Sequence, residues 1–129
     1  MQSSVTTARR VLVVDDDQAV ADTLVLLLQC LGADARVAYS GMTALAMVPE
    51  FSPDLVLVDI GMPGMDGCET AHRIRRLPQG KDLVVAAVSA WSLDDLRRRR
   101  YADAFDHQLV KPVPVEVLEK LLGLSFIEA

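Results

Sequence analysis

Reactive side chains follow four of the apolar runs in this sequence. Three consecutive aspartates, residues 15–17, come directly after the first run, and Asp59 comes directly after the third. Ser89 ends the fourth run, and Lys111 follows the fifth. If these runs are parallel strands of one sheet, their carboxyl ends meet at a single edge, which is where sites form in open α/β sheets. Several carboxylates, one hydroxyl and one ammonium would then converge.

Such a group of carboxylates needs a cation, because carboxylates gathered closely repel one another. Mg²⁺ is the natural choice, since it prefers oxygen ligands and usually takes one or two carboxylates together with waters and phosphate oxygens. No His or Cys lies within these motifs, so a softer metal is not expected. An ammonium and a hydroxyl beside the ion can hold the remaining oxygens of a phosphoryl group. The combination predicts phosphoryl transfer with a carboxylate as the covalent nucleophile.

Each of these residues also has an ordinary structural interpretation. Asp16 or Asp17 could cap the helix that follows. Asp59 could be a turn residue at a strand end, and Lys111 could be a surface charge. Their joint occurrence at four strand ends favours the chemical interpretation.

The elements that must position these residues alternate in type. Short apolar runs rich in β-branched residues are typical of strands buried on both faces. We expect strands at 11–14, 36–38, 55–58, 83–88 and 107–110. Amphipathic stretches with capping residues predict helices between them. We expect helices at 18–31, 41–50, 68–76, 93–102 and 114–122. This alternation predicts an α/β fold in which five helices flank a five-stranded parallel sheet.

The chain is the size of one domain and has no linker or repeat. We expect a flexible segment over 1–10, the folded domain over 11–124 and a short tail over 125–129. The net charge of −5 argues against a direct nucleic-acid binder. The sequence contains no apolar stretch of signal-peptide or membrane-span length. We therefore expect a soluble cytoplasmic protein whose two cysteines are reduced.

Four segments carry a resemblance to the receiver domains of bacterial response regulators, the CheY-like domains of two-component systems. They are VLVVDDD (11–17), PDLVLVDIGMPGMDG (53–67), VSA (88–90) and KP (111–112). The resemblance covers residues 11 to about 124, and the DxxMPxMDG pattern in the second segment is highly specific. It implies a flavodoxin-like, doubly wound fold with strand order 2-1-3-4-5, with two helices on one face and three on the other.

The resemblance also implies roles for the acidic residues. Asp59 matches the phosphoacceptor, which attacks a phosphohistidine on a partner kinase. Asp15 and Asp16 match the acidic pair that binds Mg²⁺, with Asp16 the more direct ligand. Asp59 and the backbone carbonyl of Gly61 would complete the protein's share of the metal site.

Further roles follow from the matches outside the acidic cluster. Ser89 and Lys111 match the two residues that contact phosphoryl oxygens, and the bond from Lys111 to Pro112 is cis in typical members. Gln108 occupies a position where many members carry an aromatic switch residue, so that switch is not available here. Trp91 lies two positions after Ser89, where a side chain modulates the lifetime of the phosphorylated form.

The resulting hypothesis is a phosphorylatable signalling switch rather than an enzyme. Its expected partners are a sensor or hybrid histidine kinase, or a phosphotransfer protein, and a downstream protein target. A stand-alone receiver and a fragment of a hybrid kinase both fit, and a weak homodimer stays open. Four arginines at 97–100 could be a contact surface or a solvated helix face. The first helix is also unusually apolar, so a partner helix could cover its excess apolar residues.

Three alternatives are weaker. A phosphatase of the haloacid dehalogenase type would need a second Asp two positions after the nucleophile, where this chain has Gly61. A nucleotide binder would need a glycine-rich turn after the first strand, where this chain has three aspartates. A degenerate receiver would lack some of the chemical residues, all of which are present.

Overall fold

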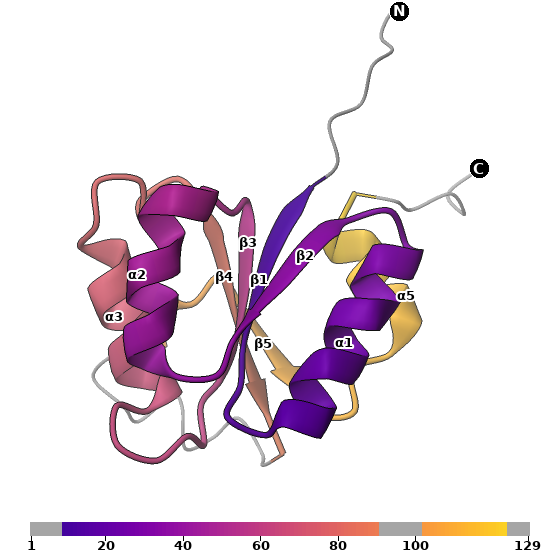
Figure 1. Cartoon of the computed structure of the whole chain (residues 1–129), viewed down its shortest axis with the longest axis horizontal. Helices are drawn as coiled ribbons and strands as arrows, with labels where there is room; N and C mark the ends of the chain where they lie inside the picture. The colour runs from indigo at the N-terminus through magenta and orange to yellow at the C-terminus, as the bar shows by residue number, and fades with distance from the viewer. Residues whose placement is uncertain (1–8, 91–101, 124–129) are drawn as a thin grey trace, which may run out of the picture.

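The computed structural model describes residues 9–90 and 102–123, and a parallel sheet with helices on both faces runs through them (Figure 1). The elements are β1 (Arg10–Val14), α1 (Gln18–Cys30), β2 (Asp34–Ala38), α2 (Gly41–Phe51), β3 (Leu55–Asp59), α3 (Gly67–Arg75), β4 (Val84–Ser89), the 3-10 helix η1 (Ala102–Ala104), β5 (His107–Val110) and α5 (Val115–Leu121). The fourth predicted helix, apart from its last residue, lies outside the described residues.

The sheet has the order β2-β1-β3-β4-β5, and every neighbouring pair is parallel. This confirms the predicted α/β fold and strand order. In the register of the central pair, Val14 is the partner of Val58. The residues that follow this pair are Asp15, directly after β1, and Asp59, the last residue of β3. They therefore lie at the same end of two adjacent strands.

Alternation along β1 divides the core into two halves, because successive residues of a strand face opposite sides of the sheet. Leu12 and Val14 pack in the half that includes buried residues of α2 and α3. Val11 and Val13 pack in the half that includes buried residues of α1 and α5. Figure 1 shows the same division, with α2 and α3 on one side of the sheet and α1 and α5 on the other. These four apolar residues of β1 are at most 1% exposed, as the unbroken apolar run predicts.

Two strands begin earlier than the sequence indicates. β1 starts at Arg10, whose backbone N–H donates to the Asp54 carboxylate at 2.9 Å. β2 starts at Asp34, which pairs with Arg10. Backbone pairing extends both strands beyond their apolar residues. Within the described residues, no helix has the length and apolar character needed to cross a bilayer.

Candidate functional site

Three carboxylates meet where β1 and β3 end. One oxygen from each of Asp15, Asp16 and Asp59 can be chosen so that all three lie within 4.8 Å of one another. The Asp15 side chain is 5% exposed and that of Asp59 is 13% exposed, whereas Asp16 is an exposed residue. The structure thus brings together the acidic residues that the sequence assigned to one site.

The third aspartate of the run has a different role. The Asp17 carboxylate accepts the backbone N–H of Val20 at 3.2 Å and caps the first turn of α1. The backbone N–H of Asp17 in turn donates to Oδ1 of Asp15 at 3.0 Å. This contact holds Asp15, so the helix cap and the acidic site are built from one turn.

The ammonium of Lys111 reaches the cluster from the end of the edge strand β5. Its Nζ lies 3.1 Å from Oδ2 of Asp15 and 3.6 Å from Oδ1 of Asp59. The backbone N–H of Lys111 donates to the Ser89 carbonyl at 2.8 Å, which ties the end of β5 to the end of β4. The bond from Lys111 to Pro112 is cis, as expected.

The charges in this site affect one another. Burial raises the pKa of Asp59, and the nearby Asp15 carboxylate raises it further. The backbone N–H of Gly61 and the ammonium of Lys111 lower it, but they do not outweigh burial. Burial lowers the pKa of Lys111, yet the hydrogen bond to Asp15 and the charges of both carboxylates raise it overall. Lys111 therefore stays protonated, while ionised Asp59 is costly without a further cation.

These donors fit Mg²⁺. The available atoms are carboxylate oxygens, which suit this hard ion, and Asp16 is exposed enough to leave room for waters. Both oxygens of Asp15 already accept hydrogen bonds, from Asp17 and Lys111. Asp16 and Asp59 are therefore better placed than Asp15 to bind an ion directly.

The other predicted site residues lie on β4 and β5 and in the loop after β3, or outside the described residues. Ser89 is buried at the end of β4, and Gln108 is half-buried in β5. The backbone N–H of Gly61 donates to Oδ1 of Asp59 at 3.1 Å. Among the described residues, a Cβ atom at Gly61 would approach only that same oxygen, at 3.7 Å. Trp91 and the arginine run at 97–100 lie outside the described residues.

Gly67 is a site residue whose packing role the sequence did not reveal. A Cβ atom there would lie 2.6 Å from the Cα of Ile60 and would collide with the Asp59 carbonyl. The close approach lets α3 begin directly against the backbone of Asp59 and Ile60. Its place in the DxxMPxMDG pattern was the signal that could have indicated this.

A comparison with protein families matches residues 11–123 to the response regulator receiver domain. The chain belongs to this family. It is therefore a receiver domain of two-component signalling, a phosphoacceptor module with an acidic site of the kind that binds Mg²⁺.

Several known proteins are similar to this chain. An uncharacterized 14.6 kDa protein of Leptolyngbya boryana is 37% identical over 84% of this chain and 83% of its own. The sensor histidine kinase RcsC of Salmonella typhimurium is 36% identical over 88% of this chain but only 12% of the kinase. The solved structure of response regulator TrrA from Thermotoga maritima, in complex with Mg²⁺-BeF, is 33% identical with a TM-score of 0.78. That comparison covers 91% of this chain and 99% of TrrA.

A cavity of about 560 Å³ extends from the acidic site of the receiver along α1. Asp15, Asp59 and Lys111 belong to its lining. The remaining lining residues come from α1, the central strands and the segment after β5: Val13, Val14, Ala19, Val20, Thr23, Leu24, Leu27, Leu57, Val88, Pro112 and Val113. The cavity is thus mostly apolar, with charged groups from the acidic site.

Proposed function

We propose that this receiver accepts a phosphoryl group onto Asp59 from a phosphohistidine of a histidine kinase or phosphotransfer protein. The observation that carries the proposal is the meeting of Asp15, Asp16 and Asp59 within 4.8 Å, with the Lys111 ammonium 3.6 Å from Asp59. A carboxylate beside a cation-binding cluster and a fixed ammonium is suited to covalent phosphoryl transfer.

In the proposed step, a carboxylate oxygen of Asp59 attacks the phosphorus atom of the phosphohistidine. An O–P bond forms, the N–P bond breaks, and the released imidazole takes a proton. Lys111 then moves from Asp59 to a phosphoryl oxygen, and the Ser89 hydroxyl binds another. Asp15, Asp16, Asp59 and the Gly61 carbonyl would hold Mg²⁺, which neutralises charge on the transferred group when bound.

The lifetime of the acyl phosphate depends on access of water to Asp59. Hydrolysis breaks the O–P bond and returns free carboxylate and phosphate. Among the described residues, only Asp59 lies near the position of a Gly61 side chain, so water can approach from there, whereas the apolar side chain of Trp91 has no group that would orient it. Because Gln108 replaces an aromatic switch residue, we propose that the signal leaves through the segment after Ser89.

The cavity beside the acidic site supplies a docking surface for the donor. Val20 is 39% exposed and Leu27 is 37% exposed, and both line the cavity. A partner helix that laid apolar side chains there would bring its histidine to the end of β3. We propose that this exchange takes place in the cytoplasm, without direct nucleic-acid contact, and that the phosphorylated form binds a downstream protein.

Mass spectrometry after incubation with acetyl phosphate and Mg²⁺ tests the proposal. The wild type should gain one phosphoryl group, and Asp59→Asn should gain none. Asp54→Asn is the matched control, because Asp54 precedes the same strand but lies far from its carboxyl end. Labelling of Asp59→Asn, or undiminished labelling in excess chelator, would contradict the proposal.

A further inference from the structure

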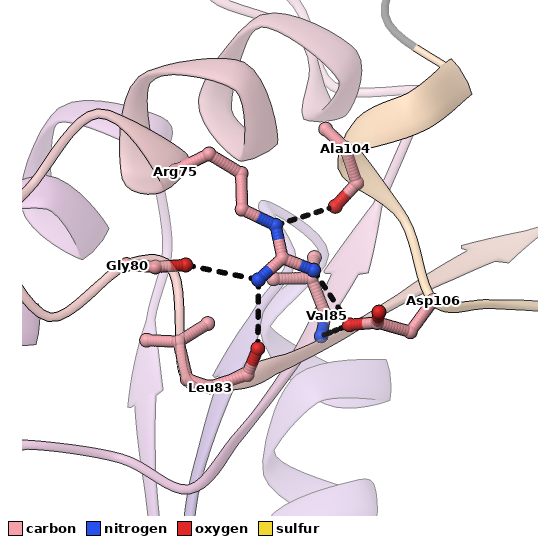
Figure 2. A network of polar contacts seen from close by, with 6 residues as sticks. All are labelled: Arg75, Gly80, Leu83, Val85, Ala104 and Asp106. Atoms are coloured by element: carbon pink, nitrogen blue, oxygen red, sulfur yellow. Dashed lines mark hydrogen bonds and ion pairs between the residues drawn. The ribbon is translucent and has the colours of Figure 1, made fainter.

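Arg75 is the last residue of α3, and its guanidinium group links this helix to the segment before β4 and to the segment before β5 (Figure 2). Its Nε donates to the carbonyl of Ala104 at 2.9 Å. Its Nη1 donates to the carbonyls of Gly80 at 2.9 Å and Leu83 at 2.7 Å. The Arg75 side chain is only 21% exposed. These contacts form at the amino-terminal edge of the sheet, opposite the acidic site.

The remaining contact of the guanidinium is with Asp106, directly before β5. Nη2 of Arg75 lies 2.5 Å from Oδ2 of Asp106. The same carboxylate oxygen accepts the backbone N–H of Val85 at 2.9 Å, and the backbone N–H of Asp106 donates to the Val85 carbonyl at 2.7 Å. Asp106 is thus fixed both to β4 and to α3.

β5 needs such an anchor because it is a short strand at the edge of the sheet. It has four residues, and within the described part of the chain its only strand neighbour is β4. A slip of one residue would turn every side chain of β5 to the other face of the sheet. Lys111 follows β5 directly, five residues after Asp106 or about 16 Å along an extended strand.

We propose that Arg75 is a positioning residue for phosphoryl transfer: through Asp106 it fixes β5 along β4 and so places Lys111 against Asp15 and Asp59. The two ends of β5 are the evidence. One is held by Arg75 and Asp106, and the other is where Lys111 Nζ reaches Asp15 at 3.1 Å. A slip of one residue would move Lys111 by about 3.3 Å, which is enough to break that contact.

The test compares Arg75→Met with Arg73→Met. Arg73 is the matched control because it lies on the same helix but, within the described residues, forms only an exposed ion pair with Glu69. Arg75→Met should slow phosphorylation by acetyl phosphate by at least about tenfold, since small displacements of reacting groups carry large costs. Its Mg²⁺ affinity should not fall, because the metal ligands lie at the ends of β1 and β3 and a displaced Lys111 only takes a positive charge away from them. Arg73→Met should change neither.

A merely structural role for Arg75 would give other results. General loosening would lower Mg²⁺ affinity and phosphorylation together, which would overturn the inference, as would an unchanged phosphorylation rate. In a Lys111→Met background, Arg75→Met should cause no further loss, and a further loss would also overturn the inference. If Arg75→Met does not fold, Arg75→Lys serves in its place, because one ammonium cannot make all four contacts.

This inference rests on the proposed function only for the role of Lys111. Amide hydrogen exchange distinguishes a failure of this inference from a failure of the proposed function. The backbone N–H of Lys111 donates to Ser89, so in Arg75→Met it should exchange faster whether or not Asp59 is the phosphoacceptor. Unchanged protection of that N–H would reject the positioning role. Absence of phosphorylation in the wild type would instead reject the proposed function.

Discussion

Nζ of Lys111 lies 3.1 Å from Oδ2 of Asp15, although 96 positions separate the two residues in sequence. Asp15 follows β1 and Lys111 follows β5, and both β3 and β4 lie between these strands in the sheet. The contact therefore forms only when four strands are aligned at their carboxyl ends. Through this contact the edge strand β5 is linked directly to the acidic cluster.

Removing the ammonium should separate metal binding from phosphoryl transfer. Lys111→Met takes a positive charge away from three carboxylates, so we expect Mg²⁺ to bind more tightly. Phosphorylation should nevertheless slow by at least about tenfold, because a fixed donor to the transferred group is lost. Metal titration and acetyl phosphate labelling measure the two effects. Weaker Mg²⁺ binding in this variant would show that Lys111 supports the metal site instead.

Two adjacent aspartates should give opposite results on mutation. Asp16→Ala should weaken Mg²⁺ binding by about 100-fold, or about 2.8 kcal/mol, while the domain stays folded. Asp17→Ala should keep Mg²⁺ binding but lose about 1 kcal/mol of stability, because it removes the cap of α1. Calorimetric metal titration and urea unfolding measure the pair. Equal Mg²⁺ affinity in both variants would refute the division of roles.

Gly67→Ala should damage the site without touching a reactive group. The added Cβ would lie 2.6 Å from the Cα of Ile60 and would collide with the Asp59 carbonyl, so the backbone of Asp59 must shift. We expect a loss of about 1–3 kcal/mol from overpacking, together with slower phosphorylation. Gly32→Ala is a useful comparison, because no atom of the described residues lies within 4 Å of its added Cβ and the expected cost comes from its positive φ. Wild-type phosphorylation in Gly67→Ala would argue against the close packing.

Asp106 should make stability depend on pH in the acid range. Burial raises the pKa of this carboxyl, but the N–H of Val85 and the Arg75 guanidinium outweigh burial and lower it below 3.8. A carboxyl whose pKa is lower in the folded than in the unfolded protein stabilises the fold at pH values above its unfolded pKa. This stabilisation is lost as the pH falls from about 4 through the folded pKa. Urea unfolding at a series of pH values should show a weaker acid dependence in Asp106→Asn than in the wild type. An identical dependence would mean that Asp106 does not contribute.

The apolar cavity should affect phosphorylation by a protein phosphodonor but not phosphorylation by a small-molecule phosphodonor. Leu27→Glu places a charge in the cavity, so phosphorylation by a histidine kinase active on the wild type should fall at least about tenfold, or about 1.4 kcal/mol. Labelling by acetyl phosphate should not change. Leu26→Glu is the control, since Leu26 is 61% exposed and lies outside the cavity lining. Equal effects of both variants would show a general loss of stability.

The sequence by itself determined the elements and their order. The apolar run of β1 predicts a strand buried on both faces, and Ser40 caps a helix with the local contact that its residue type predicts. The family motif also placed Asp59 at the end of β3. These features depend on neighbours a few residues apart, so residue type and spacing are enough to predict them.

Only the tertiary structure decided which contacts and roles these residues have. Nothing in the spacing of Asp15, Asp16 and Asp17 shows that the first accepts Lys111, the second is exposed beside the cluster and the third caps α1. Arg75 is one of several arginines in its segment, and no local pattern distinguishes it from Arg73. Its partners depend on how α3, β4 and the approach to β5 pack together. Strand register and packing set those distances, and both arise from contacts that the chain makes only when folded.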